Sequence, residues 1–413
     1  MNPNKHKKID FFYIIGVLIL GIIVYVYLAF NISFPVLNPS YNKNEHTLVN
    51  NNSNFEWPAQ GGSAIGFNNL GVYQSHGSNK LEAMASTAKL ITALLVLNKY
   101  PLLLNQKGPM ITISPSDVSI YNNYLSAQGS VAAVVNGEKL SEYQMLQAML
   151  LPSADNIADS LAIWAYGSIN SYLLRANSYL VQKGLSDTHL AVDASGYSPE
   201  SVSTPHDLIL IGQLAMQNPV IAQIVAQKSV SNFPVVGTLK NINYLLGTDN
   251  IVGIKTGNNN LDGGIFVSAS KVNLNNSQTT IFTAIMGQSS LWNVLHYSLN
   301  LVKSIQNSFV INSGVSDLKK GSVLGTYHLN WNHQTISAIL SQSANLASLN
   351  GTKVSAKISL NTISLNTKKN TVVGKLILKN AIFKQSQTIN LILNKSPKKP
   401  PLWWLLLHPK IVL

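Results

Sequence analysis

The segment from Ala85 to Leu97 is a long apolar run with one serine and one lysine near its start. It contains no Gly or Pro, and its other residues are mostly Ala, aliphatic residues or Thr. This pattern predicts a helix over residues 86–99 that is buried on most sides at the centre of a domain. A spacing of three places Ser86 and Lys89 on one helix face, about 5–6 Å apart at Cβ.

The Ser86–Lys89 pair has the chemistry of an activated nucleophile. A serine hydroxyl becomes nucleophilic when a base takes its proton, and lysine is such a base when burial or a second cation keeps it neutral. A helix N-terminus also favours negative charge that develops on a bound substrate. A capping serine beside a lysine that extends to the surface explains the same spacing. The pair therefore needs partners elsewhere in the chain.

The N-terminal segment has the pattern of a membrane span. Lysines within residues 1–8 precede Phe11–Phe30, which is twenty residues without a charge and long enough, at about 30 Å as a helix, to cross a bilayer. This order predicts a cytoplasmic N-terminus over residues 1–8, an anchor over 9–30 and a catalytic domain on the extracellular side of the cell membrane. A cleaved signal peptide is the alternative, but no A-x-A-like site follows the span.

The composition argues against several classes of function. The chain has no cysteine, so it has no disulfides, thiol nucleophile or Cys-type metal site. Its net charge of +13 comes from scattered lysines rather than an Arg-rich helix or a basic run with aromatics. Nucleic acid is therefore not expected as a partner. A basic surface suits anionic lipid headgroups or wall polymers.

The body of the chain predicts two domains. Residues 31–58 are rich in Asn, Ser and Pro and predict a linker. Residues 59–308 place strand-like runs at both ends and helical patterns between them, which predicts an α+β fold: an antiparallel sheet with helices and a helical subdomain. Residues 309–395 change to period-two alternation, typical of a small all-β domain. Residues 396–413 form an apolar tail too short to span a bilayer.

Individual elements follow from the same patterns. Two strand-like runs on either side of Asn68-Asn69 predict a hairpin. Helices are expected over 141–150, 156–166, 170–183, 205–217 and 291–307. Strands are expected over 251–256, 264–270, 279–287, 322–327, 353–358, 372–378 and 388–393. The tail, with Trp403 and Trp404, either docks at a membrane interface or caps the β-domain.

A polar loop between two of these helices contains Ser153, Asp155 and Asn156. Ser153 could bridge to a nucleophile or a leaving group, and a nearby amide could hold a substrate carbonyl. The alternative is that Ser153 or Asp155 only caps the helix that begins near Asn156.

The expected strand over 251–256 ends with Lys255 and Thr256, and Gly257 follows it. Lys255 and Thr256 could bind a carboxylate, and Gly257 would let a substrate backbone lie against the strand as an added strand. An ordinary edge strand that runs into a turn explains the same residues.

The three segments together are more specific than any one of them. S-x-x-K at residue 86, an S-x-N-like triplet at 153 and K-T-G at 255 follow the order seen in penicillin-binding proteins and class A β-lactamases. Over residues 60–308 the chain resembles the low-molecular-weight penicillin-binding proteins, the serine-type D-alanyl-D-alanine carboxypeptidases. The segments that carry the resemblance are Ala83–Lys89, Leu150–Ala154, Asp193–Ser198 and Gly253–Gly257. The β-domain and the Trp403-Trp404 tail are similar to the C-terminal domain of that family.

The resemblance implies a hydrolase of peptidoglycan synthesis that removes the terminal D-alanine from stem peptides. Ser86 would form the acyl-enzyme and Lys89 would take its proton. The backbone N–H groups of Ser86 and Asn258 would form the oxyanion hole, while Lys255 and Thr256 would bind the terminal carboxylate. β-Lactams would acylate the same serine. No metal or other cofactor is implied.

The second motif departs from the family pattern, because its third residue is Asp155 and the amide follows as Asn156. An anion beside Lys89 and Lys255 favours the protonated form of Lys89, which weakens that residue as a base. We expect Asp155 to face the site. In the alternative, the loop is displaced by one residue, so that Asn156 takes the role of the amide and Asp155 caps the next helix.

Other functions share these residues. A non-catalytic wall-binding protein would keep the fold without turnover, and a D,D-transpeptidase would pass the same acyl group to an amine. A class A β-lactamase needs a glutamate for deacylation, for which Glu200 is in a plausible region without the expected context. The anchor and the β-domain favour the carboxypeptidase. The third residue of the stem peptide is not specified by these motifs.

Overall fold

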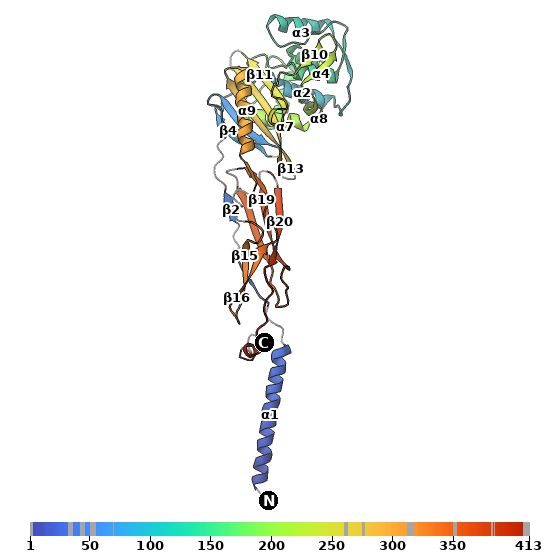
Figure 1. Ribbon diagram of the computed structural model, residues 1–413. Coiled ribbons are helices and arrows are strands. Elements are labelled where there is room, and N and C mark those ends of the chain that lie inside the picture. The colour runs from blue at the N-terminus through green and yellow to red at the C-terminus, as the bar shows by residue number, and fades with distance from the viewer. Residues whose placement is uncertain are drawn as a thin grey trace. The chain divides into compact units, whose positions relative to one another are not determined.

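The chain forms two compact units, residues 53–309 and residues 1–52 together with 310–413 (Figure 1). The computed structural model describes residues 3–31, 36–41, 46–49, 55–68, 70–259, 263–274, 277–311, 318–349, 353–380, 383 and 385–407. Parts of the expected linker, Asn69 of the expected hairpin and residues 408–413 of the expected tail lie outside these ranges.

A five-stranded antiparallel sheet forms the centre of the unit over residues 53–309. In spatial order its strands are β11 (Ile251–Asn259), β12 (Gly263–Leu274), β13 (Ser277–Gln288), β3 (Gly62–Phe67) and β4 (Gly71–Gly77). Every residue of β12 from Gly264 to Ser270 is buried, so both faces of the sheet are covered. Among the described strands, β11 is an edge of this sheet, and its open edge is available to the catalytic segment.

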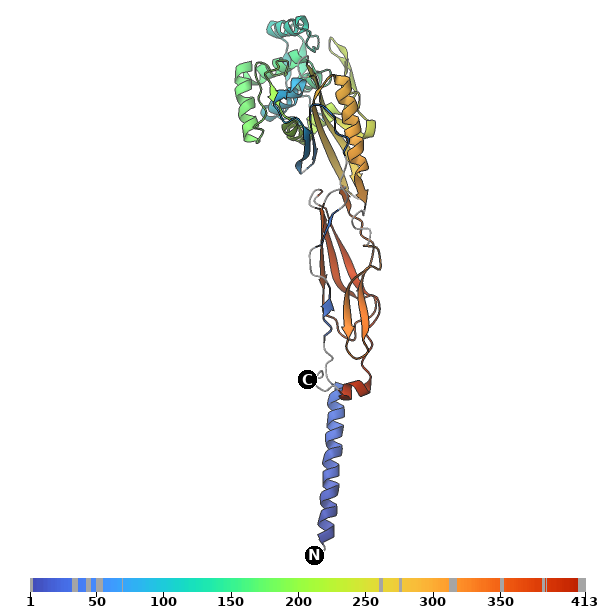
Figure 2. The same ribbon diagram turned by 90° about the vertical axis from the view of Figure 1, so that its left-hand side faces the viewer.

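Helices α7 (Pro205–Gln217) and α9 (Leu291–Asn307) pack on this sheet. Figure 2 shows α9, in orange, lying along the sheet. Gly212 of α7 lies so close to β12 that an added Cβ would be 2.9 Å from a methyl of Val267. Helix α9 begins where the side chain of Ser290 accepts a hydrogen bond from the backbone N–H of Asn293. Its strongly amphipathic sequence buries Val294, Leu301 and Ile305, among others.

The helical part of this unit surrounds the segment that the sequence placed at its centre. Its helices are α2 (Lys89–Lys99), α3 (Pro115–Ser126), α4 (Glu142–Leu150), α5 (Asp155–Tyr166), α6 (Ile169–Gln182) and α8 (Pro219–Val225). The expected central helix is shorter than predicted, because Ala85–Ala88 form a 3₁₀ turn, η1, before α2 begins. Thr87 stabilises this turn, since its backbone N–H and its hydroxyl both donate to the carbonyl of Met84.

Several short elements have no counterpart in the sequence prediction. They are the paired strands β5 (Glu82–Ala83) and β8 (Val202–Ser203), β6 (Met110–Thr112) and β7 (Lys139–Ser141), β9 (Ser229–Phe233) and β10 (Gly237–Lys240), and the 3₁₀ turn η2 (Thr248–Asn250). Helix α3 was not predicted because it buries none of its residues and so has no apolar periodicity. The sequence signal for the start of this helix is a capping box, in which the side chains of Ser114 and Asp117 each accept a hydrogen bond from the backbone N–H of the other residue.

The second unit is a seven-stranded antiparallel sheet. In spatial order its strands are β1 (Pro39–Ser40), β15 (Val323–Leu329), β16 (Gln334–Leu340), β20 (Gln385–Leu393), β19 (Val372–Asn380), β18 (Lys353–Leu360) and β2 (His46–Val49). Residues 31–58, expected as a linker, thus supply β1 and β2, which pair with β15 and β18. Two further short strands are β14 (Phe309–Ile311) and β17 (Ala347–Leu349).

The C-terminal helix α10 (Leu402–Leu407) closes one part of this β-unit. Trp404 is buried and packs edge-on against Trp331, with ring centroids 5.7 Å apart. The indole N–H of Trp331 in turn donates to the carbonyl of Lys398. Trp403 is 59% exposed. Of the two roles considered for the tail, the described residues therefore show capping through Trp404.

Helix α1 (Pro3–Asn31) contains a candidate membrane span over Phe11–Leu28, with a mean hydropathy of 2.6. By length and composition a membrane anchor and a signal sequence fit this helix equally well.

The net charge is segregated along the chain. Residues 318–413 contain 13 lysines and no Asp, Glu or Arg, whereas residues 1–317 contain equal numbers of acidic and basic residues. The net positive charge of the chain therefore comes from residues 318–413, whereas residues 1–317 are electrically balanced.

Candidate active site

The turn that carries Ser86 is held between two glycines. Ala85 has a positive φ of 45°, and an added Cβ on Gly196 would lie only 2.0 Å from the carbonyl oxygen of Ala85. On β11, a Cβ on Gly257 would be 3.3 Å from the backbone nitrogen of Ser86. Because both glycines permit this close approach, the turn lies directly against the edge of the sheet.

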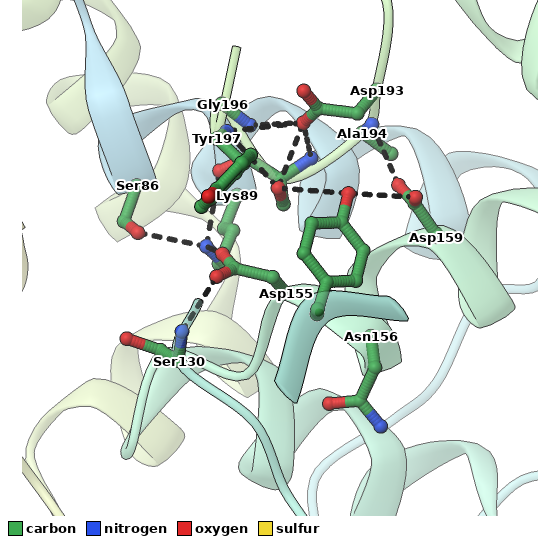
Figure 3. A network of polar contacts seen from close by, with 12 residues as sticks. Ser86, Lys89, Ser130, Asp155, Asn156, Asp159, Asp193, Ala194, Gly196 and Tyr197 are labelled. Atoms are coloured by element: carbon green, nitrogen blue, oxygen red, sulfur yellow. Dashed lines mark hydrogen bonds and ion pairs between the residues drawn. The ribbon is translucent and has the colours of Figure 1, made fainter. Parts of the chain in front are cut away.

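Lys89 lies beside Ser86 (Figure 3), and its side chain is completely buried. Its Nζ donates to Ser86 Oγ at 2.8 Å, to Asp155 Oδ1 at 2.6 Å and to the carbonyl oxygen of Ser195 at 3.0 Å. A lysine ammonium has three N–H donors, so these three acceptors satisfy all of them. The amine of Lys89 is therefore already in contact with the hydroxyl that it would activate.

Asp155 faces the site and Asn156 does not. While one carboxylate oxygen of Asp155 contacts Lys89, the other accepts from the backbone N–H of Ser130 at 2.8 Å. The amide of Asn156 is buried elsewhere, where it exchanges two hydrogen bonds with the backbone of Ala132. The residue at the N-cap of α5 is Ala154, without a side-chain cap. The structure therefore has the register that we expected for Asp155, and not the displaced loop.

A tight turn over residues 193–198 positions the third acceptor of Lys89. Oδ1 of Asp193 accepts from the backbone N–H groups of Ser195, Gly196 and Tyr197 and from the Ser195 hydroxyl (Figure 3). Its Oδ2 accepts from the N–H of Ser198. One buried carboxylate thus organises the whole turn. As a result, the carbonyl of Ser195 is directed at Lys89 Nζ.

A second buried carboxylate, Asp159 of α5, ties this turn to the helical part. Its Oδ1 accepts from the N–H of Ala194 and its Oδ2 from the hydroxyl of Tyr124, both at 2.8 Å. Burial raises the pKa of Asp159 to about 6, although the hydrogen bond from Ala194 opposes the shift. Burial and the neighbouring carboxylates Asp159 and Asp193 raise the pKa of Tyr124, so this phenol stays protonated and donates.

Ser153 lies at the cavity with a hydroxyl that has no hydrogen-bond partner among the described residues. Its backbone has a positive φ of 68°, and the residue is only 3% exposed. A buried hydroxyl without a partner is costly in a folded protein. Its open bonding capacity is therefore available to a bound molecule.

Strand β11 forms the opposite wall of the site. Lys255 is buried and donates from Nζ to the carbonyl of Thr256 at 3.0 Å. Burial lowers the pKa of Lys255 well below its usual value and the charge of Lys89 adds to this effect, whereas Asp155 opposes it. Thr256, Gly257 and Asn258 follow along the strand and line the cavity.

The cavity has a volume of about 570 Å³. Of the expected site residues, six line it: Ser86, Ser153, Asp155, Thr256, Gly257 and Asn258. Lys89 and Lys255 are buried outside this lining, and Asn156 is turned away. Within the described residues, no cluster of three or more His, Cys, Asp or Glu side chains could hold a metal ion.

The sequence analysis did not assign roles to four groups that complete this arrangement: the Ser195 carbonyl, the Ser130 N–H, Asp159 and Tyr124. The segment Asp193–Ser198 supported the family resemblance, but its link to Lys89 is a backbone contact across 106 residues. A contact from a carbonyl has no signature in side-chain identity. The N–H of Ser130 is also a backbone group, so its contact with Asp155 could not be predicted from residue type.

A model of the peptidase family S11, described as D-alanyl-D-alanine carboxypeptidase, matches residues 66–290, which is more than half of the chain. The chain belongs to this family. The family and the enzyme class expected from the three motifs, a serine-type D-Ala-D-Ala carboxypeptidase, are thereby confirmed.

Individual relatives agree with this assignment. A D-alanyl-D-alanine carboxypeptidase of Streptomyces sp. K15 is 29% identical over 217 residues, which cover 48% of this chain and 72% of the relative. The D-alanyl-D-alanine carboxypeptidase DacB2 of Mycobacterium tuberculosis is 28% identical over 160 residues, which cover 38% of this chain and half of that protein.

Solved structures confirm the fold class. Penicillin-binding protein 5 from Haemophilus influenzae matches with a TM-score of 0.56 at 18% identity, over 83% of this chain and 99% of that chain. The Streptomyces K15 DD-transpeptidase matches with a TM-score of 0.53 at 22% identity, over 60% of this chain and 98% of that chain. At these identities the matches concern the fold alone.

Proposed function

We propose that this protein is a membrane-anchored carboxypeptidase that removes the terminal D-alanine from peptidoglycan stem peptides through an acyl-enzyme on Ser86. The observation that carries the proposal is the 2.8 Å contact between Lys89 Nζ and Ser86 Oγ at the base of the cavity. A nucleophile and a base within hydrogen-bond reach, with the base held by further groups, is the arrangement that covalent catalysis requires.

In the first half of the reaction, Ser86 Oγ attacks the carbonyl between the two terminal residues while neutral Lys89 takes the hydroxyl proton. The backbone N–H groups of Ser86 and Asn258 stabilise the oxyanion of the tetrahedral intermediate. The C–N bond then breaks, and the departing amine receives a proton through the Ser153 hydroxyl, whose bonding capacity is free among the described residues. In the second half, water attacks the ester and releases the shortened peptide.

The terminal carboxylate of the substrate binds along β11. Thr256 lines the cavity, and Lys255, the residue before it on β11, is buried and supplies positive charge. Because burial lowers the pKa of Lys255, an arriving carboxylate is also what favours its charged form. Because Gly257 has no side chain, the peptide can pair with β11 as an additional strand.

Acylation by a β-lactam tests this proposal. We expect benzylpenicillin to leave a stable mass adduct on the proteolytic peptide that contains Ser86, and Ser86→Ala to abolish the adduct. A folded protein that gains no mass after prolonged incubation would contradict the proposal.

The Lys89–Asp155 ion pair favours one alternative, a wall-binding protein of the same fold without turnover. D-Alanine release from a peptide ending in D-Ala-D-Ala separates the two functions, because the binding protein releases none. The same assay with an added amine acceptor distinguishes hydrolysis from transpeptidation.

Anchoring by α1 is the membrane part of the proposal, supported by the uncharged span over Phe11–Leu28 and the lysines before it. We expect the full chain to sediment with membranes after a high-salt wash. A chain that lacks residues 1–31 but keeps β1 and β2 should remain in the supernatant. N-terminal sequencing that finds the mature protein beginning after residue 30 would instead identify a signal peptide.

A further inference from the structure

One face of the seven-stranded sheet carries three exposed lysines at regular positions. Lys357 on β18 and Lys375 and Lys379 on β19 are exposed, whereas Leu376, which alternates with the lysines of β19, is buried in the apolar core of this unit. Lys357 is paired with Ile377, which lies between the other two lysines on the same face of β19. The three lysines therefore lie together on the face that is turned away from the core.

This face, which we call the lysine face, consists of three rows that run across β18, β19 and β20. Each row contains one lysine and at least one hydroxyl or amide side chain. In the order β18, β19, β20, the rows are Ser359, Lys375 and Asn390, then Lys357, Ile377 and Thr388, and then Ser355, Lys379 and Ser386. Successive rows are two residues apart along the strands, which is about 7 Å.

Lys375 and Lys379 have no carboxylate opposite them on the neighbouring strands. Each is paired on both sides with a serine or an asparagine, and residues 318–413 contain no Asp or Glu. Like charges at neighbouring positions of a sheet repel, and the rows are closer together than the Debye length at physiological salt, which is about 8 Å. At these positions the face therefore combines positive charge with neutral hydrogen-bonding groups and supplies no counter-charge of its own.

The side chains around these lysines favour phosphate as a ligand. Phosphate oxygens accept hydrogen bonds from ammonium groups and from hydroxyl and amide side chains. Binding of nucleic acid uses aromatic or arginine side chains on which bases stack, and the three rows contain neither. Binding to a membrane surface uses exposed apolar side chains, but Ile377, the apolar residue of the rows, is partly buried. The face thus fits an anionic chain that presents phosphates without bases or acyl chains.

The spacing of the rows matches one kind of polymer. A chain of three-carbon polyols joined by phosphodiesters has twice as many backbone bonds per repeat as a polypeptide residue, so its extended repeat is about 7 Å. Successive phosphates of such a chain meet successive rows when the chain runs along β19.

We propose that the lysine face binds a linear polymer of polyol phosphates, with one phosphate in each row beside Lys375, Lys357 and Lys379. The ammonium groups neutralise the phosphates, and hydroxyl and amide side chains of the same rows donate hydrogen bonds to the phosphate oxygens. These contacts are electrostatic and exposed, so the affinity falls steeply as salt is added. The lysine face contributes no residue to the cavity at Ser86, so this assignment is independent of the proposed function.

Fluorescence anisotropy with a labelled poly(glycerol phosphate) tests the assignment, with the full-length protein held in phosphatidylcholine nanodiscs. We expect binding at 50 mM NaCl that weakens roughly twentyfold at 200 mM, as three phosphate contacts would give. Combining Lys357→Gln, Lys375→Gln and Lys379→Gln should weaken binding at 50 mM NaCl roughly tenfold or more.

A matched control separates the face from the net charge of the chain. Combining Lys319→Gln, Lys320→Gln and Lys399→Gln removes the same charge at exposed positions outside the three rows. This variant should lose less than about threefold in affinity, since its lysines contribute only through screened, longer-range attraction. Circular dichroism and thermal unfolding verify that both variants remain folded.

The competing outcomes would each overturn the assignment. An equal loss in the two triple variants would reduce the binding to net charge, and uncharged polyglycerol that competes as well as the polymer would exclude phosphate recognition. Added phosphatidylglycerol vesicles that displace the polymer at a lower phosphate concentration than unlabelled polymer would assign the face to a membrane. Single-stranded DNA of matched phosphate number that binds more tightly would assign it to nucleic acid. Failure of the parent protein to bind the polymer at 50 mM NaCl would leave the face without this ligand.

Discussion

Lys89 and Asp155 form a buried ion pair, with Nζ 2.6 Å from Oδ1 and side chains that are 0% and 4% exposed. The carboxylate stands where the motif of the family has a neutral amide. Together with Ser86 Oγ and the Ser195 carbonyl it completes the three acceptors of the lysine. In the proposed mechanism a neutral Lys89 accepts the proton of Ser86, and a neighbouring anion opposes that role because it favours a charged amine.

Replacing Asp155 with Asn tests this relationship. Removing the anion favours the neutral amine of Lys89. The rise of the acylation rate with increasing pH should therefore occur at lower pH. The acylation rate near neutrality should rise, by roughly tenfold for each pH unit of displacement. The measurement is the rate constant for benzylpenicillin acylation between pH 5 and 10.

Asn156→Ala is the matched control for that experiment. Asn156 bonds only to the backbone of Ala132 in the described structure, so its loss should lower stability without moving the pH profile. If Asn156→Ala shifts the pH profile and Asp155→Asn does not, Asn156 faces the site in the active protein in place of Asp155.

The Asp193 turn provides a second prediction. Asp193→Ala removes the acceptor of four backbone N–H groups and one hydroxyl, and buried donors left without partners are costly. We expect a loss of about 2–4 kcal/mol in the free energy of unfolding. Acylation should also slow at temperatures where the variant remains folded, because the Ser195 carbonyl is released from Lys89.

Urea denaturation and acylation kinetics of the same preparation check this expectation. Asp187→Ala is a useful comparison, since the side chain of Asp187 has no described contact with the Lys89 network. A fully active and fully stable Asp193→Ala protein would show that the turn does not depend on its carboxylate.

The division into units leads to a third prediction. All expected site residues lie within residues 53–309, which form their own compact unit with a continuous apolar core. A protein made of residues 53–309 should therefore fold and be acylated at Ser86 at the full-length rate. A protein that gives a folded circular dichroism spectrum but no adduct would show that the β-unit contributes to the site.

Sequence reasoning succeeded where an element buries one regular face. Helix α9 runs over the predicted residues 291–307, because its apolar side chains recur at helical spacing and meet the sheet. It failed where local bonding decides the structure, as in α3, which buries no residue. It also did not predict β16, although Ile336, Ala338 and Leu340 alternate inward, because Gln334 to Ser337 is too polar to stand out.

The candidate site shows the same limit. The order of the three motifs identified the side chains that the fold brings together. Asp155 and Asn156 follow Ser153, whose backbone is left-handed, and a sequence contains no direct record of such a torsion. The acceptors from Ser195 and the donor from Ser130 are backbone atoms. These groups become visible only when the chain is folded.

The last prediction concerns Glu142, the first residue of α4. Glu142 is fully buried, and neither of its carboxyl oxygens has a hydrogen-bond partner among the described residues. Burial raises its pKa from 4.5 to about 7. The folded protein thus holds a proton that the unfolded chain releases between these values, so the contribution of Glu142 to stability declines as the pH rises from 4.5 through 7.

Glu142→Gln replaces the titrating group with a neutral one of nearly the same shape. At pH 5 the two proteins should have similar free energies of unfolding, because Glu142 is mostly protonated in the folded state. At pH 8 the variant should be more stable, on the order of 2 to 3 kcal/mol. Asp159 titrates in the same direction in both proteins, so the difference between them isolates Glu142.

Urea denaturation at pH 5 and pH 8 measures this difference. Glu56→Gln, which removes an exposed carboxylate, is the control and should change little at either pH. If Glu142→Gln is less stable than the parent protein at pH 8, Glu142 is charged there and has a compensating partner. The burial of an unpaired carboxyl group at the start of α4 would then be the wrong description of this position.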